Sequence, residues 1–175
     1  MYKNKLIYGI ITARGGSKSI PNKNIKKING KPLIYYSIAT SLKSKLIDRT
    51  IMSTDSSKIL ALGKKFNCEV PFLRPKKIAK DKSTDFEVFK HLSNWLKRND
   101  KRPSYYVHLR PTHPIRNYKI IDLAIKKLIE KKNYDSLRSL SVSKETPFKT
   151  WIKKNKGIVP IVKFKKIKDS HSIPR

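Results

Sequence analysis

Short apolar runs alternate with amphipathic segments along most of the chain. A continuous apolar run is typical of a strand buried on both faces, whereas apolar positions spaced by three and four predict a helix. We therefore expect strands at residues 6–12, 50–53, 69–73, 105–109 and 136–142. Helices are expected at residues 32–42, 56–66, 84–97 and 118–130, the third from the spacing of Phe86, Phe89, Leu92 and Leu96.

This alternation predicts an α/β fold, with a mostly parallel sheet, helices on both faces and ligands at the carboxyl ends of the strands. The pattern changes at residue 147. Segments 148–153 and 157–164, parted by a turn containing Gly157, predict a C-terminal β-hairpin extension. We divide the chain into an α/β core of residues 1–146 and a hairpin segment of residues 147–175.

Composition narrows the class of protein. A length of 175 residues with 38% hydrophobic positions suits one globular domain. The single cysteine, Cys68, excludes an internal disulfide framework, so we expect it to pack in the core of a protein from a reducing compartment. The N-terminal apolar run lacks a signal-peptide cleavage site and no run reaches membrane-spanning length, so we expect a cytoplasmic protein without a membrane partner.

The net charge of +30 arises from 33 lysines and nine arginines against 12 acidic residues. The lysines are spread along the chain and form no single basic segment. This pattern predicts weak nucleic-acid binding that fades as salt rises. Because the chain has no recognition helix and no aromatic RNA-binding signature, we expect no specific nucleic-acid partner.

A glycine-containing, cation-rich loop follows the first predicted strand. Residues 13–18 read ARGGSK. Gly15 and Gly16 can adopt backbone angles closed to other residues and leave room for a phosphate oxygen, while Arg14 and Lys23 supply positive charge. The segment is neither a Walker loop nor a dinucleotide fingerprint. It still predicts a phosphate-binding loop.

The segments ITARGGSKSIPNKN and INGKPLIYYSI resemble the opening of the acylneuraminate cytidylyltransferases, the CMP-sugar-acid synthetases. Further segments follow in that family's order: STD at 53–55, VPFLRP at 70–75, LRPTHP at 109–114, and PFK at 147–149 before IPR at 173–175. The resemblance covers essentially the whole chain. It implies the Rossmann-like fold of the nucleotide-diphospho-sugar transferases.

The resemblance also implies a CTP-dependent nucleotidyltransferase. The anomeric hydroxyl of a sialic-acid-like 2-keto sugar acid would attack the α-phosphate of CTP, giving a CMP-sugar and pyrophosphate. The implied partners are CTP, a small acidic sugar and a second copy of the chain, and the implied cofactor is Mg²⁺. Two alternatives stay open: another sugar nucleotidyltransferase, of the 3-deoxy-manno-octulosonate, pseudaminate or legionaminate type, or a truncated, non-catalytic nucleotide-binding relative.

Motif positions transfer the family's site residues to this chain. The resemblance implies that Arg14 and Lys23 are catalytic, because fixed cations stabilise the charge that develops on the phosphates. The implied nucleotide-binding residues are Gly15, Gly16, Ser17, Asn24, Arg74 and Ser83, with Arg74 against the cytosine ring. The implied sugar-binding residues are Arg110, Thr112, His113, Lys149 and Arg175.

Some positions differ from the family pattern or have another interpretation. Arg110 replaces a usual glutamine and can clamp an anionic group bidentately, which is compatible with a sugar other than N-acetylneuraminate. Asp85 stands where many relatives have serine, near the base. Asp55 is interpreted as the cap of a helix beginning at Ser56. The four histidines have no zinc-ligand spacing.

The chain ends at Arg175, before the segment that in the family contains the Mg²⁺-binding aspartates. We therefore identify no metal ligand. We expect this 175-residue chain to bind nucleotide but to turn over poorly, because a metal stabilises the transition state of this reaction.

Overall fold

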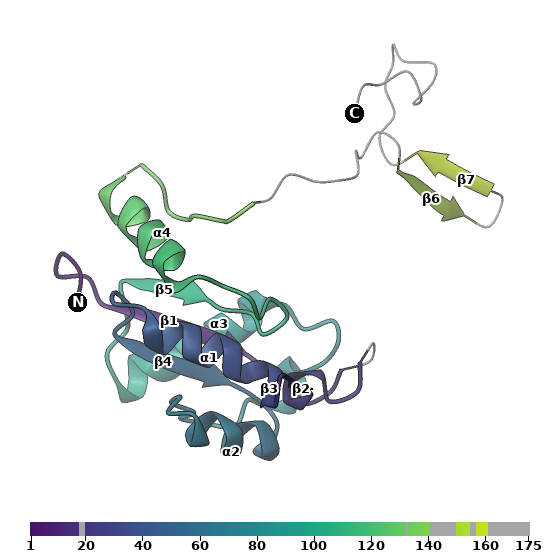
Figure 1. Cartoon of the computed structure of the whole chain (residues 1–175), viewed down its shortest axis with the longest axis horizontal. Coiled ribbons are helices and arrows are strands. Elements are labelled where there is room, and N and C mark those ends of the chain that lie inside the picture. The colour runs from purple at the N-terminus through teal and green to yellow at the C-terminus, as the bar shows by residue number, and fades with distance from the viewer. Residues whose placement is uncertain (18–19, 132, 141–149, 155–156, 161–175) are drawn as a thin grey trace, which may run out of the picture. The chain divides into compact units, whose positions relative to one another are not determined.

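In the computed structural model, strand β1 (Ile7–Thr12) lies at the centre of a three-stranded sheet (Figure 1). Strands β4 (Arg49–Ser53) and β5 (Tyr105–His108) flank it, in the order β4-β1-β5, and both pairings are parallel. Every residue of β1 except Thr12 is buried, as expected for a central strand covered on both faces.

The structure describes residues 1–17, 20–131, 133–140, 150–154 and 157–160. The chain divides into two compact units, Met1–Asp135 and Ser136–Arg175, and each is described by itself. The sheet and all of the helices described below belong to the first unit.

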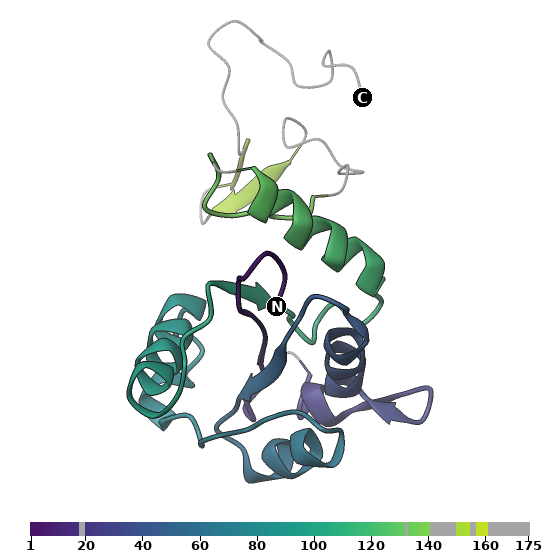
Figure 2. The ribbon, with the colours of Figure 1, turned by 90° about the vertical axis from the view of Figure 1, so that its left-hand side faces the viewer.

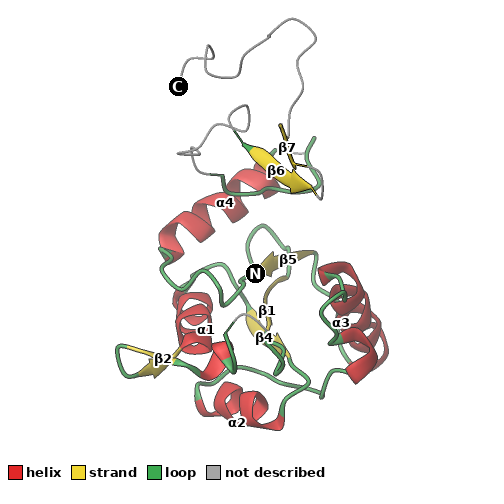
Figure 3. Cartoon of the chain, turned by 90° about the vertical axis from the view of Figure 1, so that its right-hand side faces the viewer, coloured by secondary structure: helices red, strands yellow, loops and turns green. Residues whose placement is uncertain are grey.

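Helices cover both faces of the sheet (Figures 2 and 3). Helix α1 (Leu33–Lys43) and helix α2 (Ser57–Lys65) share one apolar cluster with Ile11 and Met52. Helix α4 (Tyr118–Glu130) adds Ile121 to the edge of that cluster. Helix α3 (Asp85–Asn99) covers the opposite face. Its buried residues Leu92 and Leu96 pack with Tyr8, Ile10 and Ile51. The predicted α/β fold with helices on both faces is therefore confirmed.

Local sequence signals set the helix boundaries. Thr84 and Glu87 form a capping box at the start of α3, where each side chain accepts from the other residue's backbone N–H. Ser56 and Asn117 cap α2 and α4. The expected apolar stripe of α3 is wrong at one position: Phe86 is 73% exposed, because the buried stripe runs through Val88, Leu92 and Leu96.

Two predicted strands are not continuous strands. Segment 69–73 runs parallel to β4 but pairs through isolated bridges, Ile51 of β4 with Glu69 and Thr54, just after β4, with Leu73. Pro71 lies between those bridges and has no N–H to donate, which explains the interruption. Of the predicted strand 136–142, residues 136–140 are described and are irregular.

Two antiparallel hairpins complete the described structure. Strands β2 (Lys27–Ile28) and β3 (Lys31–Pro32) are joined at Asn29 and Gly30, whose φ angles of 48° and 75° fit a tight hairpin turn. In the second unit, β6 (Trp151–Lys154) pairs with β7 (Gly157–Pro160), which confirms the predicted C-terminal hairpin.

Cys68 is a packing residue, as expected. It is 3% exposed within the cluster that contains Ile11 and Met52. Burial, with a smaller contribution from Glu69, raises the pKa of its thiol to about 12, which leaves it without nucleophilic character at neutral pH.

Among the described residues, no helix is both long enough and apolar enough to span a bilayer.

Gly9 allows α1 to lie close to the sheet. A Cβ at this position would overlap Ser41 Oγ and lie 3.2 Å from a methyl carbon of Ile47. Ser41 also shares a buried hydrogen bond of 2.7 Å with Thr50, so it cannot move freely. We expect Gly9→Ala to lower the free energy of unfolding by about 1–3 kcal/mol, measured by urea denaturation.

Gly16→Ala is the matched control for this prediction, because a Cβ there meets no atom within 4 Å. That variant should unfold like the wild type. Equal stability of the two variants would contradict the proposed packing role of Gly9.

Candidate active site

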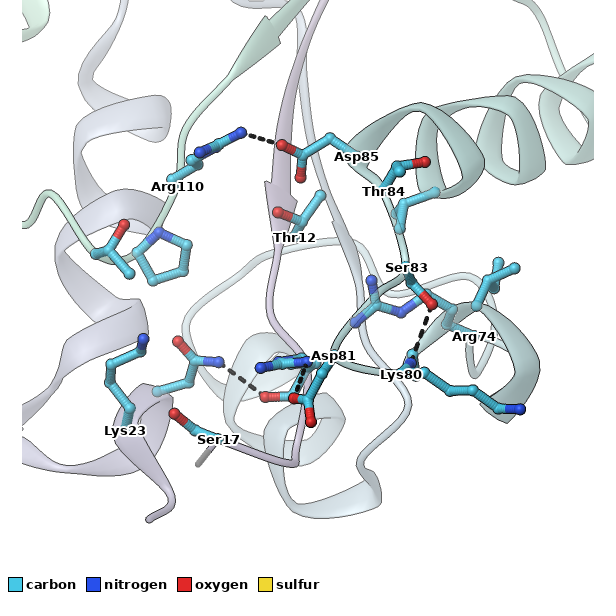
Figure 4. A pocket seen from close by; sticks show the side chains of 17 residues that line it. Thr12, Ser17, Lys23, Arg74, Lys80, Asp81, Ser83, Thr84, Asp85 and Arg110 are labelled. Carbon is cyan, nitrogen blue, oxygen red and sulfur yellow. Dashed lines mark hydrogen bonds and ion pairs between the residues drawn. The ribbon is translucent and has the colours of Figure 1, made fainter. Parts of the chain in front are cut away.

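A pocket of about 230 Å³ lies at the carboxyl ends of β1 and β5 (Figure 4). Its walls come from the loop after β1, the short 3-10 helix η1 (Lys23–Ile25), the segment 78–85 leading into α3, and the loop after β5. This is the edge of the sheet where ligands are expected in a parallel α/β fold. All of its lining residues belong to the first unit.

The loop after β1 contributes cations to the pocket, and a buried side chain holds its backbone in place. Asn24 is buried, and its amide Nδ2 donates to the backbone oxygen of Arg14 over 2.8 Å. The Arg14 guanidinium lies 2.7 Å from Asp81 Oδ1 across the pocket. Ser17 and Lys23 also line the pocket. The predicted cations Arg14 and Lys23 are therefore brought together with Ser17 and Asn24.

The conformational argument for Gly15 and Gly16 is wrong. Neither has a positive φ, and neither lines the pocket. The N–H of Gly15 donates to Asp55 Oδ1 over 2.9 Å, and a Cβ on Gly15 would lie 3.0 Å from that of Ser56. Gly15 is therefore needed for close approach to the start of α2.

Asp55 does not cap α2. The cap is Ser56, whose hydroxyl accepts from the Ile59 N–H over 3.4 Å. Besides binding the Gly15 amide, Asp55 Oδ1 lies 3.6 Å from Arg74 Nη2. One carboxylate thus connects the first loop to a buried arginine.

Arg74 is the most deeply buried cation of the pocket, with 6% exposure. Burial lowers the pKa of its guanidinium, and the charge of Asp55 opposes that shift. Its Nε and Nη2 atoms have no hydrogen-bond partner among the described residues. Buried donors are seldom left unpaired, so these atoms indicate a ligand with acceptor atoms.

The segment that precedes α3 forms a third wall. Ser83 Oγ accepts from the Lys80 N–H over 3.1 Å, which closes a turn at the pocket. Asp81 lies within that turn and Asp85 follows it, and both line the pocket. Sequence reasoning assigned no role to Asp81, although the acidic residues in DKSTD are a signal within so basic a chain.

The loop after β5 brings Arg110 and Thr112 into the pocket, but His113 is not among the lining residues. Arg110 was expected to present a free guanidinium to an anionic group. Its Nη2 instead pairs with Asp85 Oδ2. The two departures from the family pattern are therefore partners of each other.

Arg116 holds this loop in place, a role that sequence reasoning missed. One of its nitrogens donates to the Arg110 backbone oxygen over 2.6 Å, and the other donates to Ser37 Oγ on α1 over 3.1 Å. Burial lowers the pKa of Arg116. Its only signal in the sequence was its position just after the LRPTHP segment.

His108, at the end of β5, lies behind this wall of the pocket. Its Nε2 is 3.0 Å from Thr12 Oγ1, and its ring stacks edge-on against Phe89. Burial lowers the pKa of His108, while Asp85 acts in the opposite direction. Its neutral ring is suited to sharing a hydrogen bond with Thr12, which itself lines the pocket.

Two expected sugar-binding residues, Lys149 and Arg175, lie outside the described part of the chain. Within the described part, no group of three or more His, Cys, Asp or Glu side chains could hold a metal ion. The described residues therefore do not form a protein-only cage for Mg²⁺.

A family model described as cytidylyltransferase matches residues 8–172. The chain is 36% identical over 121 residues to a pseudaminic acid cytidylyltransferase of Campylobacter jejuni, covering 69% of this chain and 52% of that protein. It is 34% identical over 120 residues to an N-acylneuraminate cytidylyltransferase of Escherichia coli, covering 69% of this chain and 27% of that protein. The chain thus spans about half the length of the first relative and less of the second.

Among solved structures, a CMP:2-keto-3-deoxy-manno-octonic acid synthetase complexed with CTP superposes with a TM-score of 0.60 at 17% identity. The match covers 72% of this chain and 48% of that one. At this identity the likeness shows the fold, while the family model spans nearly all of the sequence. The chain therefore belongs to the cytidylyltransferase family.

Proposed function

We propose that this pocket binds CTP and that the protein transfers the cytidylyl group to a sialic-acid-like 2-keto sugar acid, giving a CMP-sugar and pyrophosphate. The observation that carries this proposal is Arg74, a buried guanidinium whose Nε and Nη2 have no hydrogen-bond partner among the described residues, in a pocket lined by further cations. The relatives named cytidylyltransferases support the same reaction.

In this proposal Arg74 reads the base. Its planar fork can donate to the O2 and N3 acceptors of cytosine, and the backbone around Ser83 supplies the facing wall. A purine base presents a different set of donors and acceptors, so we expect this fork to favour cytosine.

Arg14 and Lys23 would hold the triphosphate, with Ser17 and Asn24 beside them. When the sugar hydroxyl attacks the α-phosphate, the bond to the pyrophosphate oxygen breaks and negative charge builds on the departing group. Fixed cations that are already in place stabilise this charge without reorganisation. Gly15 and Gly16 would act through the course of the backbone rather than as direct contacts.

The sugar acid would lie toward Arg110 and Thr112, at the end of β5. We include His113, Lys149 and Arg175 in the sugar side of the proposal from their motif positions, together with a sugar-binding and dimerisation role for residues 147–175. The core that binds the nucleotide would then be residues 1–146. Relatives named for pseudaminic and legionaminic acids make these sugars the first alternatives to N-acetylneuraminate.

Mg²⁺, a homodimer and a cytoplasmic location belong to the same proposal. Mg²⁺ is commonly bound through substrate phosphates and one or two carboxylates, so a three-residue cage is not required. It would neutralise charge on the phosphates. We derive no step through it, because the described residues offer no ligand set.

Calorimetric titration of the 175-residue chain with CTP, UTP, ATP and GTP tests the nucleotide part. We expect CTP to bind at least roughly ten-fold more tightly than either purine nucleotide, a difference of about 1.4 kcal/mol. Equal affinity for all four would leave a general triphosphate site and overturn the base assignment. Release of pyrophosphate from CTP and Mg²⁺ only when a 2-keto sugar acid is present would support the transfer reaction.

A further inference from the structure

One short segment supplies acidic partners to two arginines of the pocket. Asp81 lies 2.7 Å from Arg14, and Asp85 pairs with Arg110. Arg14 follows β1 and Arg110 follows β5, so the segment 81–85 connects two walls of the pocket. In Figure 4 the Arg110–Asp85 pair and Asp81 lie at opposite ends of the pocket.

These two pairs are open to solvent, whereas the pair of Arg74 with Asp55 is largely buried. The side chains of Arg14 and Asp81 are 34% and 41% exposed, and those of Arg110 and Asp85 are 58% and 42% exposed. Arg74 and Asp55 are 5% and 19% exposed. Exposed ion pairs contribute little free energy, so another anion can replace Asp81 or Asp85 at modest cost.

We propose that Asp81 and Asp85 are specificity-determining counterions, which occupy Arg14 and Arg110 in the free protein and give way to the anionic groups of the ligand. In a chain with a net charge of +30, an uncompensated arginine pocket would attract any small polyanion. With both arginines occupied, an anion that reaches one end of the pocket replaces one carboxylate. A ligand with anionic groups at both ends replaces both.

This inference rests on the proposed function only for the identity of the natural ligand. The competition itself is electrostatic and can be tested with an inorganic probe. A failure to prefer CTP would therefore overturn the proposed function and leave the counterion roles of Asp81 and Asp85 open to their own test.

The experiment compares the wild type with Asp81→Asn, Asp85→Asn and the double variant. Binding of inorganic tripolyphosphate is measured by calorimetry at fixed ionic strength, since salt screens exposed charges. Each single variant should bind the probe roughly three- to ten-fold more tightly than the wild type, and the double variant more tightly still.

Asp100→Asn is the matched control. Asp100 forms a 2.5 Å ion pair with Arg49, which begins β4 at the amino end of that strand, away from the pocket. The control therefore makes the same change in net charge and also breaks an Asp–Arg pair. It should bind tripolyphosphate like the wild type.

A gain in Asp81→Asn and Asp85→Asn that exceeds the control supports the proposal. No gain over the control, or no measurable binding in any variant, overturns it. Weaker binding in Asp85→Asn also overturns it, because Asp85 would then position Arg110 for the ligand. Since Asp85 is the first residue of α3, Asp85→Ser provides a second variant if the asparagine protein does not fold.

Discussion

Replacing Arg74 by methionine should weaken CTP binding by about 2–3 kcal/mol, or roughly 30- to 150-fold. The guanidinium is buried in the pocket, and its Nε and Nη2 have no hydrogen-bond partner among the described residues. Methionine fills similar space but donates no hydrogen bond. The acceptors of the base would then lose water without gaining a donor. Calorimetric titration with CTP measures the loss.

Two further variants test whether the loss is specific to Arg74 and to its planar guanidinium. Arg74→Lys keeps a positive charge but lacks the planar fork, so it should recover part of the affinity and little of the preference for CTP. Arg98→Met makes the same substitution on an exposed residue in the last turn of α3 and should bind CTP like the wild type. An Arg74→Met protein that is folded and binds CTP normally would exclude Arg74 from the base site.

Replacing Asp55 by alanine should lower the free energy of unfolding by about 2–3 kcal/mol. Removing one partner of a fully buried ion pair costs about 3–5 kcal/mol, because it leaves the other charge buried and uncompensated. Asp55 is 19% exposed, so we expect a smaller effect here. The Gly15 N–H also loses its acceptor. Urea denaturation with an unchanged m-value would report this loss as stability alone.

The double variant Asp55→Ala/Arg74→Met tests the reason for this loss. Without the buried guanidinium, the missing carboxylate leaves no uncompensated charge, so the double variant should lose less stability than the two single variants together. Asp55→Asn should fall between the wild type and Asp55→Ala, because its amide oxygen still accepts from Gly15. Strictly additive losses would show that Asp55 and Arg74 do not stabilise each other.

The acidic residues are what distinguish the folded site from the site expected from the sequence. Three arginines were each assigned to a ligand: Arg14 to phosphate, Arg74 to the base and Arg110 to the sugar. In the structure each lies beside a carboxylate, from Asp81, Asp55 and Asp85 respectively. We therefore expect ligand binding at this pocket to exchange ion-pair partners, in addition to direct attraction.

The order and type of most elements could be predicted because their signals are local. Such signals depend on residues that lie close together in the sequence. Examples are the buried run of β1, the apolar spacing of α3 with its Thr84 capping box, and the Asn29-Gly30 turn. The placement of the pocket followed too, since parallel strands end at one edge of the sheet. The prediction of a continuous strand at residues 69–73 was wrong, because Pro71 has no backbone N–H to donate to the sheet.

The sequence by itself determined that four cations reach the pocket, Arg14, Lys23, Arg74 and Arg110, because all four lie in segments that follow expected strands. Only the tertiary structure decided their partners. Asp55 meets Gly15, which is 40 residues away, and Asp85 meets Arg110, which is 25 residues away. No local pattern encodes such contacts. They arise when packing the helices against the sheet brings distant loops to one edge, where opposite charges then pair.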